Sequence, residues 1–69
     1  MIISNVKKMM EDKNVTIRQM MAGTGLSDKT ILRARCGQIN QCRLYTLESI
    51  SVFLGCKVKD LFDEQSEML

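Results

Sequence analysis

The 69-residue chain contains no histidine and no proline, and its three cysteines form no C-x-x-C pair. Histidine is the commonest metal ligand and a frequent general base, so its absence removes many catalytic and zinc-binding arrangements. No segment pairs a nucleophile with a base, and so short a chain leaves little room for a substrate pocket. We therefore expect a protein that is not an enzyme and that binds no metal or cofactor.

Two further absences bear on where the chain resides. No apolar run approaches the roughly 18 residues of a membrane-spanning helix. The odd number of cysteines (Cys36, Cys42 and Cys56) and the lack of a signal peptide favour free thiols in the cytoplasm. For Cys36 two interpretations stay open, a buried inert thiol or an exposed redox sensor.

Strands are not expected, because no segment alternates apolar and polar residues with enrichment in β-branched side chains. The apolar spacing instead predicts an all-α fold of five short helices, over about residues 3–13, 17–23, 28–36, 43–54 and 56–62. Glycines are expected to end three of these helices: Gly23 with Gly25, Gly37, and Gly55. The expected inward faces carry Ile3, Val6 and Met10; Ile17, Met20 and Met21; Ile31 and Ala34; Leu44, Leu47, Ile50 and Leu54; and Val58, Leu61 and Phe62.

The most informative segment runs from Thr16 to Gly37, TIRQMMAGTGLSDKTILRARCG. Thr16 and Ser27 are predicted N-caps, because each precedes a helical pattern and offers a hydroxyl to a free amide. Asn14 and Gly25 are predicted to adopt the left-handed conformation that ends a helix. A helix, a tight turn and a second helix in this order are typical of a DNA-binding helix-turn-helix.

Charge is distributed unevenly around this segment, although the net charge is only +2. The last ten residues contain four acids and no base, which leaves ten bases and four acids in residues 1–59. Residues 16–43 contain five of these bases and the single acid Asp28. A basic zone that coincides with a helix-turn-helix favours a surface that binds a polyanion over a merely solvated face.

The order of features resembles the lambda-repressor/Cro-like helix-turn-helix family, also called the xenobiotic response element family. The strongest matches are Gly25-Leu26-Ser27, Thr30-Ile31, Gly37 and the run Leu44–Phe62, with Leu54-Gly55 and Asp60-Leu61-Phe62. The resemblance covers about residues 3–62. It implies a compact five-helix DNA-binding domain over 1–62, with the motif at 16–37 and an acidic, loose tail at 63–69. Met21 departs from the family pattern, which usually has alanine there.

The resemblance implies that the third helix contacts base edges through Asp28, Lys29, Thr30 and Arg33. Residue chemistry agrees for Lys29 and Arg33, which lie four apart on one helix face and can donate to guanine. For Asp28, helix capping and acceptance from cytosine stay equally open. Phosphate contacts are expected from Thr16, Arg18, Ser27, Asn40, Gln41 and Arg43.

These features predict a sequence-specific transcriptional regulator, a repressor that binds a palindromic operator as a homodimer. The resemblance implies a bacterial or phage setting. A dimer surface is expected at Tyr45, Phe53, Cys56 and Val58. The alternative is an antitoxin or accessory subunit that binds another protein through the tail from Asp63 to Leu69. A third interpretation is an interaction module that no longer binds DNA.

Overall fold

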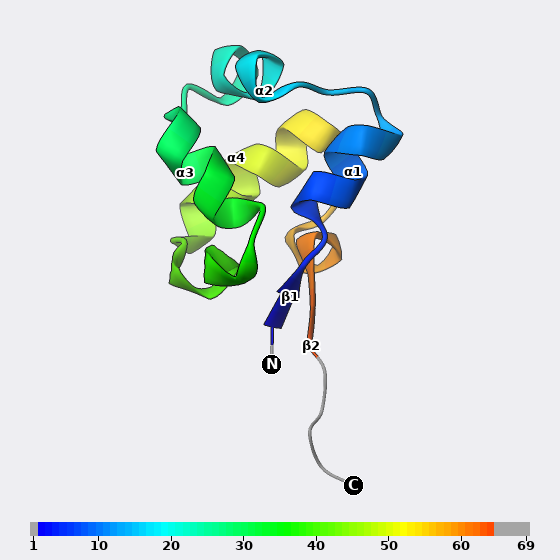
Figure 1. Cartoon of the computed structure of the whole chain (residues 1–69), viewed down its shortest axis with the longest axis vertical. Coiled ribbons are helices and arrows are strands. Elements are labelled where there is room, and N and C mark those ends of the chain that lie inside the picture. The colour runs from blue at the N-terminus through cyan, green and yellow to red at the C-terminus, as the bar shows by residue number, and fades with distance from the viewer. Residues whose placement is uncertain (1, 65–69) are drawn as a thin grey trace, which may run out of the picture.

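Residues 2–64 are described by the computed structural model and contain four α-helices, two 3-10 helices and one pair of short strands (Figure 1). In chain order the elements are β1 (Ile2–Ser4), α1 (Val6–Asp12), α2 (Ile17–Thr24), α3 (Asp28–Ala34), η1 (Gly37–Gln41), α4 (Leu44–Leu54), η2 (Val58–Leu61) and β2 (Phe62–Glu64). The expectation of five α-helices is therefore wrong, because the last helical segment is a 3-10 turn.

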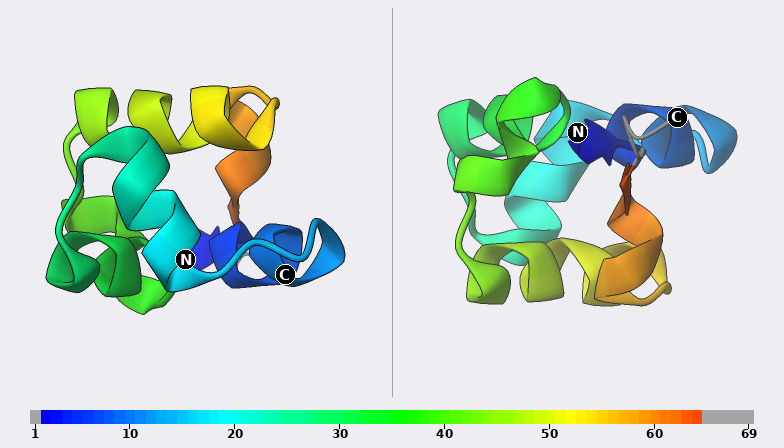
Figure 2. Two further views of the ribbon diagram at one scale, coloured as in Figure 1. Left: turned by 90° about the horizontal axis from the view of Figure 1, so that it is seen from above. Right: turned by 90° about the horizontal axis from the view of Figure 1, so that it is seen from below.

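The helices enclose one hydrophobic core. Figure 2 shows α4 and α1 along opposite sides of the molecule, with α2 and α3 closing one end and η2 the other. Each of the four α-helices and both 3-10 helices contributes apolar side chains to this core. Its buried members are Val6, Met10, Met20, Ile31, Ala34, Ile39, Leu47, Ile50, Leu54 and Leu61. Each of the five segments predicted to be helical therefore supplies at least one side chain that is buried in the core.

Strands β1 and β2 form an antiparallel pair in which Ile2 lies opposite Glu64 and Ser4 opposite Phe62. The backbone amide of Asn5 donates to the carbonyl of Leu61 at 2.7 Å, and its side-chain Nδ2 donates to Asp63 Oδ2 at 3.0 Å. The expectations of no strand and of a loose chain from residue 63 are thus wrong for these segments. Strands of three residues are too short to display alternation. Residues 65–69 of the predicted tail lie outside the described residues.

Helix boundaries also differ from the sequence predictions. The first helix begins at Val6, because residues 2–4 pair with β2 and carry Ile3 out of the helix. The third helix ends at Ala34, and Gly37 begins η1 instead of ending α3. The stretch between the third and fourth predicted helices forms this 3-10 helix, and its one apolar residue, Ile39, is buried in the core.

Three residues expected to face inward are exposed. Ile3 lies in β1, and 36% of its surface is accessible. Met21 is 37% exposed, because its neighbour Met20 takes the core position of α2. Leu44 is 74% exposed, since α4 begins there and the buried stripe of that helix starts at Thr46 and Leu47.

The predicted helix signals of the motif are confirmed. Thr16 Oγ1 accepts from the backbone amide of Gln19 at 3.1 Å, and Gln19 Oε1 accepts from the amide of Thr16 at 2.9 Å. This reciprocal pair is a capping box. Gly25 ends α2 at φ 75°, and Asn14 has φ 55°. Helix α2 is therefore fixed at both ends by local hydrogen bonding and backbone conformation.

Gly23 lies within α2, although it was expected to end that helix. The ring of Phe53 on α4 occupies the space that a Cβ atom on Gly23 would need. The close approach of α2 and α4 therefore depends on the absence of a side chain at this position.

We expect Gly23→Ala to lower the free energy of unfolding by about 1–2 kcal/mol, because displacing the ring outweighs the gain in helix propensity. Gly37→Ala is the matched control, since a Cβ there meets no atom within 4 Å. Urea unfolding of both variants measures the difference. Equal stability of Gly23→Ala and the parent protein would show that the ring is not held against α2.

Candidate nucleic-acid interface

Helices α2 and α3 form the helix-turn-helix, joined through Gly25, Leu26 and Ser27. They pack against each other, and α2 also packs against α4. Leu26, the apolar residue of this turn, is half-buried and packs against the core. Both helices are held against the core, and both lie at the periphery of the molecule (Figure 1).

The two sides of α3 differ in burial and in charge. Ile31 and Ala34 are fully buried. Lys29 and Arg33 are exposed, and neither side chain forms a hydrogen bond or ion pair with the residues that the structure describes. Two cationic side chains one helical turn apart are therefore available to an external ligand. Leu32, which is 48% exposed, adds an apolar contact surface beside them.

The first turn of α3 is held by its own polar side chains. Ser27 Oγ accepts from the amide of Thr30 at 3.3 Å and lies 2.9 Å from the Thr30 hydroxyl oxygen. Asp28 Oδ1 accepts from the amide of Lys29 at 2.8 Å. The capping interpretation of Asp28 therefore has a bond in the structure, and its contact with a base stays a prediction. Thr30 is half-buried, so its hydroxyl is less accessible than the Lys29 side chain.

The residues expected to contact phosphates lie on the segments that precede and follow α3. Thr16 and Arg18 are at the start of α2, Asn40 and Gln41 are on η1, and Arg43 is the N-cap of α4. All five are exposed. Because η1 packs against α3, Asn40 and Gln41 lie on a segment that contacts that helix. The contact of these residues with phosphate stays a prediction.

The side chains of Arg33 and Arg35 point in nearly opposite directions from the helix axis. A rotation of about 100° per residue places these two side chains roughly 200° apart around the axis. Arg35 is half-buried, and its Nε is buried without a hydrogen-bond partner in the described part of the chain. The two arginines therefore face different surroundings, Arg33 the solvent and Arg35 the body of the domain.

The three cysteines are free thiols. Cys36 is exposed, and its Sγ donates to the carbonyl of Arg33 at 3.3 Å. Burial raises the pKa of Cys42, a shift that nearby Arg33 opposes, and burial also raises the pKa of Cys56. Both half-buried thiols thus stay protonated at neutral pH. The exposure of Cys36 excludes the interpretation of a buried thiol.

The residues expected at a dimer surface are divided between the outside and the core. Tyr45 is 59% exposed and Phe53 38%, whereas Cys56 and Val58 are half-buried and pack against the core. Sequence reasoning missed Val52, the most exposed large apolar side chain of the described residues at 78%. Its position seven residues after Tyr45, two turns along the same helix face, is the signal that identifies it.

Within residues 2–64, no helix is long and apolar enough to cross a membrane, and no three His, Cys, Asp or Glu side chains group as metal ligands. A comparison with curated proteins finds no match. Residues 5–66 match the model of the Cro/C1-type HTH DNA-binding domain family. The match spans the capped α2–Gly25–α3 unit and the exposed cationic face of α3. The chain therefore belongs to the Cro/C1-type helix-turn-helix family of DNA-binding domains.

Proposed function

We propose that the protein is a sequence-specific transcriptional regulator that represses by binding a palindromic operator as a homodimer. The observation that carries this proposal is the exposure of Lys29 and Arg33, unpaired among residues 2–64, on the second helix of a Cro/C1-type motif. Helix α3 enters the major groove, where each base pair presents a distinct pattern of donors, acceptors and methyl groups.

Base contacts are assigned to the outward side of α3. Arg33 donates two hydrogen bonds to O6 and N7 of a guanine, and Lys29 donates to an adjacent acceptor. Asp28, at the N-terminal end of the helix, accepts from a cytosine amino group with the carboxylate oxygen that is not bonded to Lys29. Thr30 supplies a shorter contact at the same end.

Phosphate contacts hold the helix in register. Thr16, Arg18 and Ser27 lie at the starts of α2 and α3, and Asn40, Gln41 and Arg43 lie on η1 and at the start of α4. These side chains contact the sugar-phosphate backbone on either side of the groove. Such contacts determine orientation and carry no sequence information directly.

A dimer is required because one recognition helix covers too few base pairs to select a site in a genome. We assign its surface to α4, centred on Tyr45 and including Phe53 and the newly identified Val52, because these apolar side chains are exposed. Cys56 and Val58 support that surface from the core side.

The alternative role as an antitoxin or accessory subunit required the acidic tail as a docking segment. Asp63 and Glu64 belong to β2, and Asp63 accepts a hydrogen bond from Asn5. The start of the tail is therefore part of the domain. Residues 65–69 lie outside the described residues, and no observation favours this alternative over DNA binding as the main role.

Arg33→Ala is expected to weaken binding to the preferred site by about 1–3 kcal/mol and to relax specificity at one base pair. The physical reason is the loss of two hydrogen bonds to a guanine edge. Fluorescence anisotropy with the preferred duplex and with random duplex measures the two affinities. An equal loss on both duplexes would remove Arg33 from the base contacts.

Arg43→Ala is expected to weaken all sequences alike and to reduce the slope of log K against log salt by about one unit, since one fewer counterion is released. The matched control is Lys8→Ala, which removes the same charge from the exposed side of α1. If the Arg43 variant keeps the parent slope, or if the control changes it equally, Arg43 does not contact a phosphate.

Tyr45→Glu is expected to reduce affinity for a two-half-site duplex about tenfold or more, because a charge enters the apolar centre of the dimer surface. Affinity for an isolated half-site should be unchanged. Sedimentation equilibrium measures the accompanying loss of dimer, and Lys8→Ala again serves as the control. A variant that binds both duplexes like the parent protein would place the dimer surface elsewhere.

A further inference from the structure

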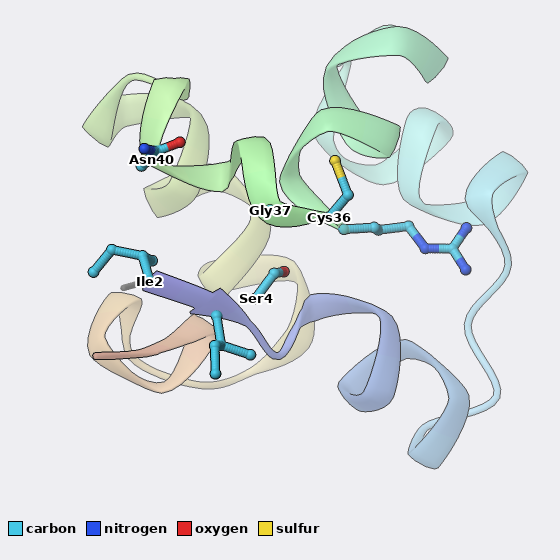
Figure 3. A pocket seen from close by; sticks show the side chains of 7 residues that line it. Ile2, Ser4, Cys36, Gly37 and Asn40 are labelled. Carbon is cyan, nitrogen blue, oxygen red and sulfur yellow. The ribbon is translucent and has the colours of Figure 1, made fainter. Parts of the chain in front are cut away.

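Two hollows on the described surface differ in what lies beside them. One, of about 540 Å³, separates β1 from η1, with Ile2 and Asn40 on its two sides, and no aromatic or acidic residue lines it (Figure 3). The other, of about 360 Å³, lies between α2 and α4 and is lined by Gly23, Thr24, Glu48, Ser49 and Val52. Of the two, only the second adjoins the exposed apolar side of α4, because Val52 borders it.

The exposed side of α4 is a narrow stripe opposite the core. Tyr45 and Val52 lie two turns apart and point in nearly the same direction, and both are largely exposed. Glu48 and Ser49 lie midway between them, one on each side of the line that joins them. These four residues are the α4 stripe, which has an aromatic ring at its beginning and the hollow toward its end.

Glu48 brings a free negative charge to the middle of the α4 stripe. Among residues 2–64 its carboxylate forms no ion pair or hydrogen bond, since the bond from Ser51 Oγ, at 2.7 Å, reaches its backbone carbonyl. Glu48 is the only charged residue that lines the hollow, and Gly23 and Thr24 border it from α2 without charge. A partner that covers the stripe therefore meets a carboxylate that the domain itself does not neutralise.

We propose that the α4 stripe packs antiparallel on the same stripe of a second copy, and that repulsion between the two Glu48 carboxylates keeps this dimer weak in the absence of DNA. The proposal rests on the homodimer of the proposed function. It adds the orientation of the two α4 helices and the residue that limits the affinity of the dimer.

A second copy fits the α4 stripe because the two ends of the stripe complement each other. In a two-fold contact the same surface supplies both sides. A two-fold axis midway between Tyr45 and Val52 brings Tyr45 of each copy over Val52 of the other and beside its hollow. The aromatic ring is then covered, while its hydroxyl stays at the wet rim. Ser49 adds little bulk at the crossing, and its hydroxyl is already bonded to the carbonyl of Tyr45 at 3.1 Å.

The same axis brings the two Glu48 side chains together, because residues nearest a two-fold axis meet their own copies. Along the helices, Glu48 and Ser49 are each displaced from their copies by only about 1.5 Å, whereas Val52 is displaced by about 10 Å. Like charges placed together oppose association. The repulsion matters because the stripe is small beside a stable interface, which has about 20–30 residues on each side.

DNA offsets this repulsion. Two copies bound to adjacent half-sites are held at a high effective concentration, so a contact too weak to form in free solution forms on the operator. Dimer formation is thereby coupled to DNA binding.

The first experiment measures self-association of the full-length protein without DNA by sedimentation equilibrium. Glu48→Gln should tighten the dimer at least about tenfold, because it removes the repulsion and keeps the size of the side chain. Glu11→Gln is the matched control, since it makes the same charge change on the exposed side of α1 and should have no effect. Glu48→Gln self-association no tighter than that of the parent protein would overturn the proposal.

Salt tests the electrostatic cause. Raising sodium chloride from about 0.05 M to about 0.5 M should tighten the parent dimer more than the Glu48→Gln dimer, because salt screens exposed charges. An equal response of the two proteins would show that the carboxylates do not face each other.

Disulfide trapping tests the orientation, in a Cys36→Ser background that removes the exposed thiol. Ser49→Cys should form a disulfide-linked dimer under mild oxidation, because each copy of residue 49 lies beside the axis. Val52→Cys should not, because its two copies are too far apart for a disulfide. Both variants are oxidised with and without a two-half-site duplex. Ser49→Cys that stays monomeric in both conditions, or Val52→Cys that links as readily, would overturn the antiparallel arrangement.

The outcomes for the stripe and for the proposed function are distinguishable. A protein that is trapped through Ser49→Cys and tightened by Glu48→Gln, but selects no DNA sequence, would contradict the proposed function and leave the arrangement of α4 intact. A dimer that selects a palindrome but shows neither effect would overturn the arrangement alone. A protein that stays monomeric on and off DNA would overturn both the arrangement and the homodimer.

Discussion

Burial of Ile31 and Ala34 determines which side of α3 faces solvent, and the rest of the structure depends on this orientation. These two side chains have no accessible surface, so they fix the rotation of α3 about its own axis. With that rotation fixed, Lys29 and Arg33 must face solvent and Arg35 must face the domain. If α3 were rotated about its axis by the angle of one residue, about 100°, Arg33 would no longer face solvent directly. The same rotation would bring a polar side chain toward the core, where a donor without a hydrogen-bond partner destabilises the fold. The outward position of Lys29 and Arg33 is thus a consequence of how α3 packs on the core.

The pairing of β1 with β2 adds a second constraint. It brings the two ends of the described chain together and places Ile2 opposite η1, with Asn5 bonded to both Leu61 and Asp63. The proposed phosphate donors on η1 therefore sit against a sheet formed by segments some sixty residues apart. Strand β2 thus reaches η1 through β1, and η1 in turn packs against α3.

The sequence predicted the features that depend on neighbouring residues. The cap at Thr16, the left-handed Gly25, the end of α4 at Gly55, and the outward pair Lys29 and Arg33 follow from spacings of four residues or fewer. Gln19 completes the capping box and was visible as T-x-x-Q, although only Thr16 was identified.

The remaining features depend on contacts between distant segments. The choice between Met20 and Met21 as core residue is a rotation of about 100° that only the packing of α2 on α3 and α4 decides. Likewise Leu44 is apolar but lies before the buried stripe of α4, and β1 exists only because β2 is beside it.

The central claim is that the outward face of α3, presented twice by a dimer, selects a DNA sequence. Selection of binding sites from random-sequence DNA with the parent protein tests it most directly. The account predicts enrichment of a palindrome whose half-sites are centred about 34 Å apart, one turn of the double helix. Recovery of sequences with no common site would contradict it.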